Sequence, residues 1–232
     1  MNQQVQHLAI IMDGNRRWAK AQGLQAWLGH RKGTQAVEAA VNCCLTMGIP
    51  HLSLYVFSLE NFKRSRLEQE YLFDLLVSKA QERLEDFIKK GVRIRFIGDR
   101  ALFPESVRVT CQQIEERSAH NKQLCVDLLF CYGGQQEIVA GVQAIVQDVQ
   151  AGIVESSAIT PELFAHYLWN HGAPEPDLIV RTGGKQRLSN FLLFQSAYSE
   201  IRFVDTFWPD VTEPVITEWV TTFNQVERNF GA

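Results

Sequence analysis

Hydrophobic and polar residues are arranged along the chain in a pattern that predicts short buried strands separated by amphipathic helices. Strands are predicted at His7 to Met12, Leu52 to Phe57, Val92 to Ile97, Leu124 to Phe130, Leu178 to Arg181 and Ile201 to Val204. Helices are predicted at Gly33 to Met47, Leu67 to Lys90, Pro104 to His120, Gln136 to Gln150, Pro161 to Asn170, Leu188 to Tyr198 and Glu213 to Arg228. This alternation is typical of an α/β fold with a six-stranded, mainly parallel sheet flanked by helices.

Length and composition narrow the class of protein. The 232 residues can form one well-buried core, and no linker, repeat or low-complexity tract divides them, so we expect a single domain over residues 1–232. The formal net charge of −3 excludes a generally basic, nucleic-acid-binding surface. No signal-like start and no apolar run of membrane-spanning length is present, so we expect a soluble, cytoplasmic protein. The five cysteines lack zinc-type spacing and are typical of reduced thiols.

The densest group of polar candidates lies between Asp177 and Asp210. A short apolar strand is predicted to lead through Thr182-Gly183-Gly184 into a helix, whose N-terminus would favour an anion. Three basic residues, a hydroxyl and a carboxylate surround this point: Arg181, Lys185, Arg187, Ser189 and Glu200. These residue types indicate a site for phosphate or carboxylate, with Glu200 as a ligand for a bridging hard cation. The alternative is an ordinary set of solvated charges around a loop.

A second group follows the first predicted strand, in Met12-Asp13-Gly14-Asn15-Arg16-Arg17-Trp18. Asp13 is suited to magnesium, Gly14 allows a close backbone approach, and Arg17 can bind an oxyanion. In an open parallel sheet, ligands bind beyond the carboxyl ends of the strands, which is where both groups lie. Taken alone, Asp-Gly-Asn is an ordinary turn.

Four segments together resemble the signatures of the cis-prenyltransferases, the family of undecaprenyl diphosphate synthase. They are HLAIIMDGNRRWAK followed by GHRKG, FSLENFKR at 57–64, CYGG at 131–134, and RTGGKQRLSNFLLFQSAYSEIRFVDTFWPD at 181–210. The first and last resemble the family's H-x-A-I-I-M-D-G-N-x-R-W-A and R-T-[SG]-G-E-x-R-[LI]-S-N-F-L. The resemblance extends over almost the whole chain.

The resemblance implies a homodimeric enzyme that joins an allylic diphosphate to isopentenyl diphosphate with Mg2+, in a deep apolar tunnel. It implies that Asp13 is the catalytic carboxylate and holds the metal together with Glu200. Ser58 and Asn61 would position the acceptor or relay a proton. The remaining substrate-binding residues would be Gly14, Asn15, Arg16, Arg17, Trp18 and His30 on the allylic side, Phe62 and Arg64 in the 57–64 loop, and Arg181, Arg187 and Ser189 on isopentenyl diphosphate. Any contact with a membrane would be peripheral and made through the lipid product.

The chain departs from the family pattern at several positions. Ala26 replaces an arginine of the allylic site, Lys185 replaces the glutamate after Gly-Gly, and Cys131 replaces the asparagine before Tyr-Gly-Gly. Gln135-Gln136 replaces a basic and an aromatic residue, and the C-terminal R-x-G appears as Asn229-Phe230-Gly231, with Arg228 one place early. A lost charge-assisted bond to phosphate costs about 1.5 to 3 kcal/mol, so these changes indicate a diverged member.

The resemblance implies that product length depends on two positions where long-chain members of the family carry small residues. Here they are Val56 and Phe130, with Leu129 beside the latter. A phenylalanine in a close-packed interior fills space that a growing chain would cross, which favours a short product or a non-standard coupling of two allylic units. The alternative is that Phe130 turns into the core and the protein makes a long undecaprenyl-type carrier for cell-wall lipid.

Other functions stay open from the sequence. One is a non-catalytic partner subunit of a heteromeric prenyltransferase, although Asp13 and Arg181 are kept. Another is an unrelated phosphate-binding α/β protein such as a phosphatase, although the chain has no nucleophile motif beside the predicted anion site. We predict that some of the large apolar residues between 191 and 208 face a partner chain; the alternative is that all of them lie in the core. They are Phe191, Leu192, Phe194, Tyr198, Phe203, Phe207 and Trp208.

Overall fold

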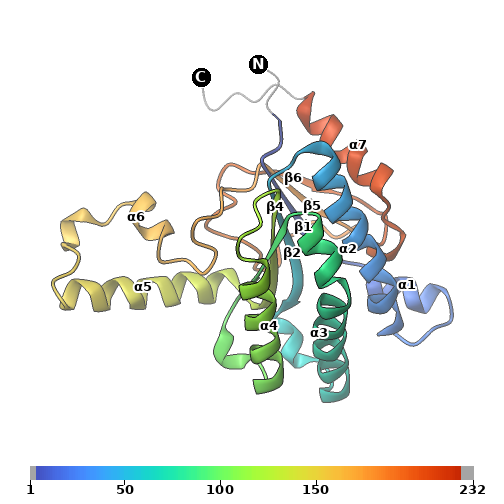
Figure 1. Cartoon of the computed structure of the whole chain (residues 1–232), viewed down its shortest axis with the longest axis horizontal. Helices are drawn as coiled ribbons and strands as arrows, with labels where there is room; N and C mark the ends of the chain where they lie inside the picture. The colour runs from blue at the N-terminus through green and yellow to red at the C-terminus, as the bar shows by residue number, and fades with distance from the viewer. Residues whose placement is uncertain (1–3, 226–232) are drawn as a thin grey trace.

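The computed structural model describes residues 4–225, and its centre is a six-stranded sheet (Figure 1). The strands are β1 His7–Ile11, β2 His51–Ser58, β3 Val92–Ile97, β4 Leu124–Tyr132, β5 Leu178–Arg181 and β6 Glu200–Phe203. Their order is β3-β4-β2-β1-β5-β6, and every neighbouring pair is parallel. The predicted α/β class is confirmed, with a sheet that is wholly parallel.

The helices mostly follow the predicted pattern. They are α1 Asn15–Ala21, α2 Leu28–Met47, α3 Arg66–Lys89, α4 Glu105–Ser118, α5 Gly134–Gln150, α6 Pro161–Ala165 and α7 Glu213–Asn224, with the 3-10 turns η1 Leu59–Lys63, η2 Arg100–Leu102, η3 Ser156–Ala158 and η4 Trp208–Asp210. Helix α1 was not predicted, and α6 ends at Ala165, earlier than expected. The departures at 228–231 lie outside the described residues.

The helix predicted at Leu188 to Tyr198 is wrong. This segment forms successive turns, and Ser189, Asn190 and Leu192 have φ angles of 53°, 67° and 40°. Left-handed residues cannot continue an α-helix. The Asn190 side chain holds the turns instead, because its Oδ1 accepts a hydrogen bond of 2.8 Å from the Gln135 N–H. No helix N-terminus therefore follows the glycines after β5.

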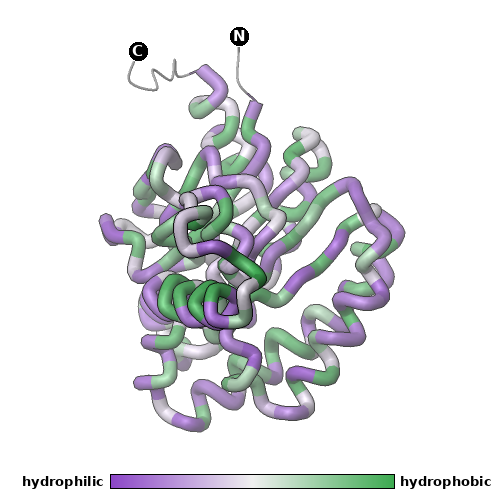
Figure 2. Tube along the Cα trace, turned by 90° about the vertical axis from the view of Figure 1, so that its left-hand side faces the viewer, coloured by the Kyte–Doolittle hydropathy of each residue, from purple (hydrophilic) through white to green (hydrophobic). Residues whose placement is uncertain are grey.

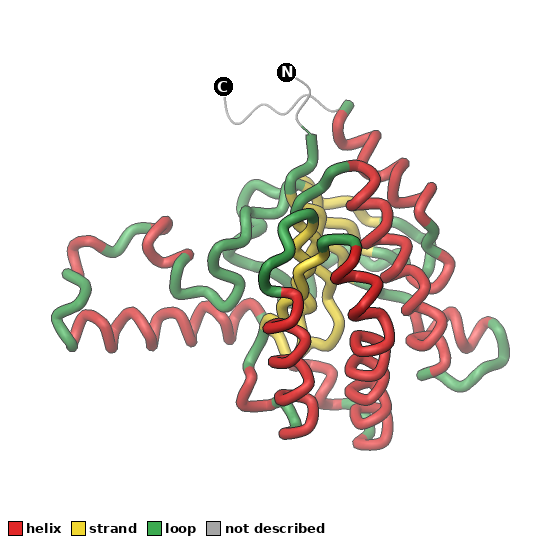
Figure 3. The backbone as a smooth tube through the Cα atoms, viewed as in Figure 1, coloured by secondary structure: helices red, strands yellow, loops and turns green. Residues whose placement is uncertain are grey.

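The two faces of the sheet are covered differently. Leu8, Ile10 and alternate residues of the other strands pack in the larger apolar cluster, together with residues of α2, α3, α4 and α7. Ala9 and Ile11 point to the opposite face, where Phe191 and other residues of the 188–192 turns cover them. Figure 3 shows the helices lying in front of the strands and loops lying beside them.

A buried polar network joins four strands away from their carboxyl ends. His7 Nε2 lies 2.8 Å from Ser53 Oγ, and His51 Nε2 lies 3.1 Å from Asp127 Oδ2. Arg95 donates two hydrogen bonds of 2.7 Å to Asp127. Because buried polar groups are costly when unpaired, these contacts favour one strand register.

Helix α5 projects from the body as an arm, and α6 folds back beside its outer end (Figure 1). Figure 2 faces this side and shows hydrophobic residues recurring around the helix that points toward the viewer. Val139, Val142 and Val146 are 56%, 47% and 46% exposed. They are spaced three and four residues apart and therefore share one helix face. No helix within residues 4–225 is long and apolar enough to cross a lipid bilayer.

Candidate active site

Asp13 lies where β1 ends, and two arginines flank its carboxylate. Arg181 Nη2 donates to Oδ2 at 2.8 Å, and Arg17 Nη2 lies 3.1 Å from Oδ1. The Gly14 N–H also donates to Oδ1, at 2.6 Å. Partial burial raises the pKa of Asp13, but the hydrogen bond and charge of Arg181, with Arg17 and Gly14, hold it below its ordinary value. Asp13 is therefore an anion held among cations.

Pairing of β1 with β5 brings the two ends of the sequence to this carboxylate. Ile11 is opposite Arg181 in the register, so Asp13 and Thr182 both follow the paired strand ends. The Thr182 hydroxyl donates to the Asp13 carbonyl at 2.6 Å. Gly14 has a φ of 107°, and a Cβ there would lie 2.7 Å from Phe207 Cδ1. Only glycine fits this turn without moving its neighbours.

The Arg181 side chain is 4% exposed and organises the polar residues that follow β5. Its Nη1 donates to the Arg187 carbonyl at 2.5 Å and to Ser189 Oγ at 2.7 Å. Arg187 Nε donates to the same hydroxyl at 3.0 Å. The structure thus brings together Asp13, Arg17, Arg181, Arg187 and Ser189, so side chains rather than a helix N-terminus surround the place where an anion was predicted.

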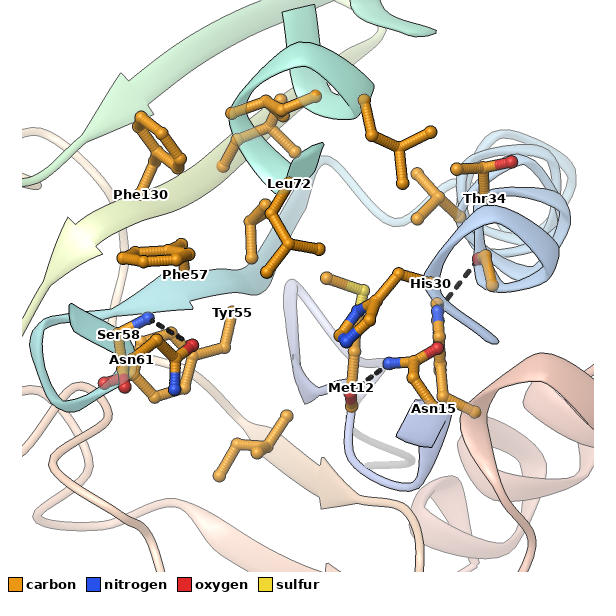
Figure 4. A pocket seen from close by; sticks show the side chains of 18 of the residues that line it. Met12, Asn15, His30, Thr34, Tyr55, Phe57, Ser58, Asn61, Leu72 and Phe130 are labelled. Atoms are coloured by element: carbon orange, nitrogen blue, oxygen red, sulfur yellow. Dashed lines mark hydrogen bonds between the residues drawn. The ribbon is translucent and has the colours of Figure 1, made fainter. Parts of the chain in front are cut away.

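An apolar cavity of about 710 Å3 opens beside Asp13. Polar residues lie at one end of it, and Leu72 and Phe130 lie farther in (Figure 4). Alternate residues of β4, namely Phe130, Leu128 and Val126, line one wall. The cavity continues along α3 from Leu72 to Phe87, which spans about 22 Å of helix at 1.5 Å per residue.

Asn15 and His30 line the polar end and carry unpaired atoms. Asn15 Nδ2 donates to the Met12 carbonyl at 3.0 Å, while Asn15 Oδ1 is buried without a partner. His30 Nε2 is also buried and unpaired, and burial, with the charges of Arg64 and Arg16, lowers the pKa of His30 to about 3. A neutral imidazole can donate one hydrogen bond to a ligand oxygen.

The 57–64 loop forms the opposite rim of the polar end. Asn61 Oδ1 accepts from the Ser58 N–H at 3.2 Å, so η1 keeps both predicted residues at the cavity (Figure 4). Arg64 Nη1 lies 3.3 Å from Glu68 Oε1, and Arg16 Nε lies 3.7 Å from the same oxygen. Arg64 lines the cavity, whereas Arg16 remains mostly exposed.

Some predicted site residues lie elsewhere. Trp18 Nε1 donates to Asp210 at 2.7 Å and attaches α1 to η4. The Phe62 ring packs on Phe57 and Phe73, with centroids 5.1 and 6.3 Å away, instead of lining the cavity. Glu200 pairs with Leu178 at the start of β5, three residues before Arg181. Within one chain, Glu200 therefore does not lie beside Asp13, which follows the other end of the sheet. Its role as a metal ligand remains a prediction.

Sequence reasoning missed three residues of the site. Tyr55 and Asn190 line the cavity, and the Tyr55 hydroxyl donates to the Ser189 carbonyl at 3.3 Å. Thr182 positions the backbone of Asp13. Tyr55 stood inside an apolar strand, where only its hydroxyl distinguished it from core residues.

A magnesium ion fits the donor set around Asp13. Magnesium is usually held by one or two carboxylates, waters and substrate phosphates. Asp13 supplies one ionised carboxylate, and the buried, unpartnered Asn15 Oδ1 lies on the same segment. Asp13 would hold the ion, with diphosphate oxygens and water completing its shell, and the more exposed Arg17 would remain available to the diphosphate.

The fold and the site are those of a prenyltransferase, with cationic side chains at the mouth of an apolar cavity. The family described as "Putative undecaprenyl diphosphate synthase" matches residues 11–231. An isoprenyl transferase of Clostridium perfringens is 39% identical over 225 residues, which cover 97% of this chain and 89% of the relative. A tritrans,polycis-undecaprenyl-diphosphate synthase (geranylgeranyl-diphosphate specific) of Pyrococcus abyssi is 41% identical over 227 residues, covering 97% and 86%. The chain belongs to this family and is a cis-prenyltransferase.

A solved structure supports the same assignment. Lavandulyl diphosphate synthase from Lavandula x intermedia, in complex with dimethylallyl diphosphate, matches with a TM-score of 0.95 and 29% identity. The match covers 99% of each chain. The expected resemblance is therefore confirmed at the level of both sequence and fold.

Proposed function

We propose that this cis-prenyltransferase condenses an allylic diphosphate with isopentenyl diphosphate, or with a second allylic unit, to a short product. The observation that carries the proposal is the volume of the cavity, about 710 Å3. A cavity of about 150 Å3 holds one benzene ring, or about 25 Å3 per carbon. At that density the cavity holds about 28 heavy atoms, which is one diphosphate with about 15 to 20 carbons.

The residues at the polar end supply binding and charge stabilisation. The allylic diphosphate would lie on Asn15, Arg17 and His30, and the second diphosphate on Arg187 and Ser189, with Arg181 beneath both. When bound, Mg2+ would act as a Lewis acid on the diphosphate that leaves. The arginines stabilise the charge that develops on departing pyrophosphate, since guanidinium forks match its oxygens.

Ser58 and Asn61 supply hydroxyl and amide groups beside the place where the acceptor alkene would react. After the acceptor alkene attacks the allylic cation, the new carbocation loses a proton. The Ser58 hydroxyl is too weak a base to keep that proton. It can only relay the proton to a final acceptor, which would be the diphosphate or water. We therefore assign Ser58 and Asn61 to positioning the acceptor and relaying the proton.

One observation favours a long-chain product instead. The cavity does not end at Phe130 but continues to Val126 and Ile94, near the opposite ends of their strands. The Phe130 ring packs on Phe57, Phe73 and Phe103 and forms part of a wall. Leu129 packs on the other face of the sheet, so it does not restrict the chain. A C55 chain would require the cavity to expand about twofold or to open.

Mass spectrometry of the products tests the proposal. Purified enzyme and Mg2+ would be given isopentenyl diphosphate with dimethylallyl, geranyl or farnesyl diphosphate, and dimethylallyl diphosphate alone. Products of about 10 to 20 carbons would support the short-product function, and a product from dimethylallyl diphosphate alone would assign non-standard coupling. A main product of about 50 carbons or more would overturn it. Lack of turnover by the purified chain alone, with its Asp13 intact, would favour the partner-subunit alternative.

We also propose that the enzyme is a homodimer in which the apolar face of α5 contacts the partner. Three exposed valines on a projecting helix support this, and so do Tyr198 and Phe203, which are 71% and 36% exposed. Phe191, Leu192 and Trp208 are buried within the chain, so only part of the predicted apolar set is available to a partner. Light scattering at micromolar concentration tests the assembly, and a monomer would refute it.

A further inference from the structure

The far half of the cavity lies between α2 and α3, and its wall contains one ion pair between these helices. Glu38 of α2 and Arg83 of α3 both line the cavity, and Arg83 Nε lies 2.8 Å from Glu38 Oε1. Their side chains are 31% and 41% exposed, so the pair faces both the cavity and solvent. It therefore lies on the seam where the two helices meet the surface.

The surroundings of the pair on the cavity side are mostly apolar. Val37 and Val41 flank Glu38 on α2, and Ala80 and Phe87 flank Arg83 on α3. Lys79 also lines the cavity, but it pairs with Glu82 of its own helix. The Arg83 Nε–H makes no hydrogen bond despite the short distance, so charge attraction rather than directed bonding holds the pair. A partly exposed pair of this kind is weak and can open.

We propose that the Glu38–Arg83 pair closes the seam between α2 and α3 and sets the upper length of the product. The inference rests on the proposed function, in which the cavity holds the growing hydrocarbon. Each condensation adds carbons at the diphosphate end, so the tail advances along α3 toward Arg83. A longer tail must either pass the two side chains to reach Phe87 and Ile94, which line the cavity beyond them, or leave through the seam.

The pair opposes both routes for the same physical reason. An apolar chain lying against a charged group displaces the water that solvates it and offers no hydrogen bond in return. Separating the two charges around the chain also removes their attraction while leaving each partly desolvated. Leucines at both positions would instead add apolar wall, and the next isoprene unit would gain buried area.

The experiment compares two double variants with the same positions changed. Glu38→Leu with Arg83→Leu removes both charges, and Glu38→Arg with Arg83→Glu keeps an inverted pair. Arg66→Leu is the matched control, because Arg66 pairs with Glu70 on the exposed start of α3 and does not line the cavity. We expect mass spectrometry to show products at least one isoprene unit longer for the leucine variant, and wild-type length for the other two.

A second measurement does not need turnover. Saturated prenyl diphosphates cannot ionise as allylic donors do, so calorimetry can follow their affinity as the chain is lengthened. We expect affinity to rise with length and then stop rising in the wild type, and the leucine variant to bind the next longer probe about tenfold more tightly. Circular dichroism checks that each variant is folded.

The outcomes separate this inference from the proposed function. Equal product lengths and equal binding limits in wild type and leucine variant would overturn the role of the ion pair, whatever the length is. A long wild-type product would overturn the short-product function, while a further shift in the leucine variant would still support the pair. If no variant turned over any substrate, the binding series alone would decide.

Discussion

Replacing Phe130 by alanine tests how the aromatic wall limits the hydrocarbon. Phe130 is fully buried and lines the cavity, and its ring centroid lies 4.8 Å from Phe103, 5.0 Å from Phe73 and 5.8 Å from Phe57. The substitution removes six ring carbons, the size of benzene, and opens about 150 Å3. That is room for about one isoprene unit, so we expect the main product to lengthen by one unit.

The same change has a cost in stability. Truncation of a buried phenylalanine to alanine destabilises a protein by about 3 to 5 kcal/mol, because apolar contacts are lost and a cavity remains. We expect a value near the lower end, since the new space joins an existing cavity rather than forming a closed one. Urea unfolding followed by circular dichroism measures this loss, and Phe130→Leu, which keeps part of the volume, should show a smaller one.

Product analysis of folded enzyme then decides the role of the ring. The assay uses mass spectrometry with geranyl and farnesyl diphosphate as donors, at a temperature where the variant is fully folded. If Phe130→Ala loses stability as expected but its product length is unchanged, the ring belongs to the core only, and the reasoning from volume is refuted. Lengthening in Phe130→Ala and not in Phe130→Leu would support it.

Further predictions concern charge, protonation and assembly. Asp13→Asn should lower kcat/KM by about 100-fold or more, because the ionised carboxylate that holds Mg2+ is lost, and its far-ultraviolet circular dichroism should stay that of wild type; near-normal turnover would contradict the proposed role. Arg181→Lys should raise KM for isopentenyl diphosphate about tenfold or more, since one ammonium cannot replace the guanidinium fork that holds Ser189 Oγ and Asp13; an unchanged KM in steady-state kinetics would contradict it. Burial, with the charge of His51, lowers the pKa of His7 to about 3, so the unfolded state binds the extra proton below about pH 6.5 and stability should fall with decreasing pH by up to about 1.4 kcal/mol per unit; His7→Asn should reduce this slope in denaturant titrations at pH 4 to 7, and an equal slope in both proteins would contradict it. Val142→Glu should dissociate the proposed dimer in light scattering, while Val154→Glu, outside α5, should not.

The sequence was sufficient for the strands because each is a short apolar run bounded by polar or glycine residues. All six predicted strands are present; β3 and β5 have the predicted bounds, and the ends of the other four differ by at most two residues. The motif after β1 also predicted that Asp13 and Arg17 lie together at the end of this strand, and the structure places Arg17 Nη2 3.1 Å from Asp13 Oδ1. Local patterns thus predicted both the sheet and the residues directly at its carboxyl ends.

The 188–198 segment could not be predicted from its periodicity. Its apolar residues recur as on a helix, but Asn190 takes a left-handed conformation and binds the turn before α5 through side-chain and backbone groups. Tertiary hydrogen bonds therefore override local propensity. Likewise Glu200 follows the signature closely in sequence, yet the parallel pairing of β6 carries it to the start of β5.

The position of β1 explains why two distant signatures form one site. β1 lies between β2 and β5, so the loops after all three strands meet at one edge of the sheet. Arg181 is nearly buried there, and an unpaired buried guanidinium would be costly, so the chain needs a carboxylate at that place even without substrate. Asp13 meets this need while keeping one oxygen near the more exposed Arg17. The residue that neutralises the core-facing arginine is therefore also the one that we propose binds a metal–diphosphate complex, which would couple folding of the site to its proposed chemistry.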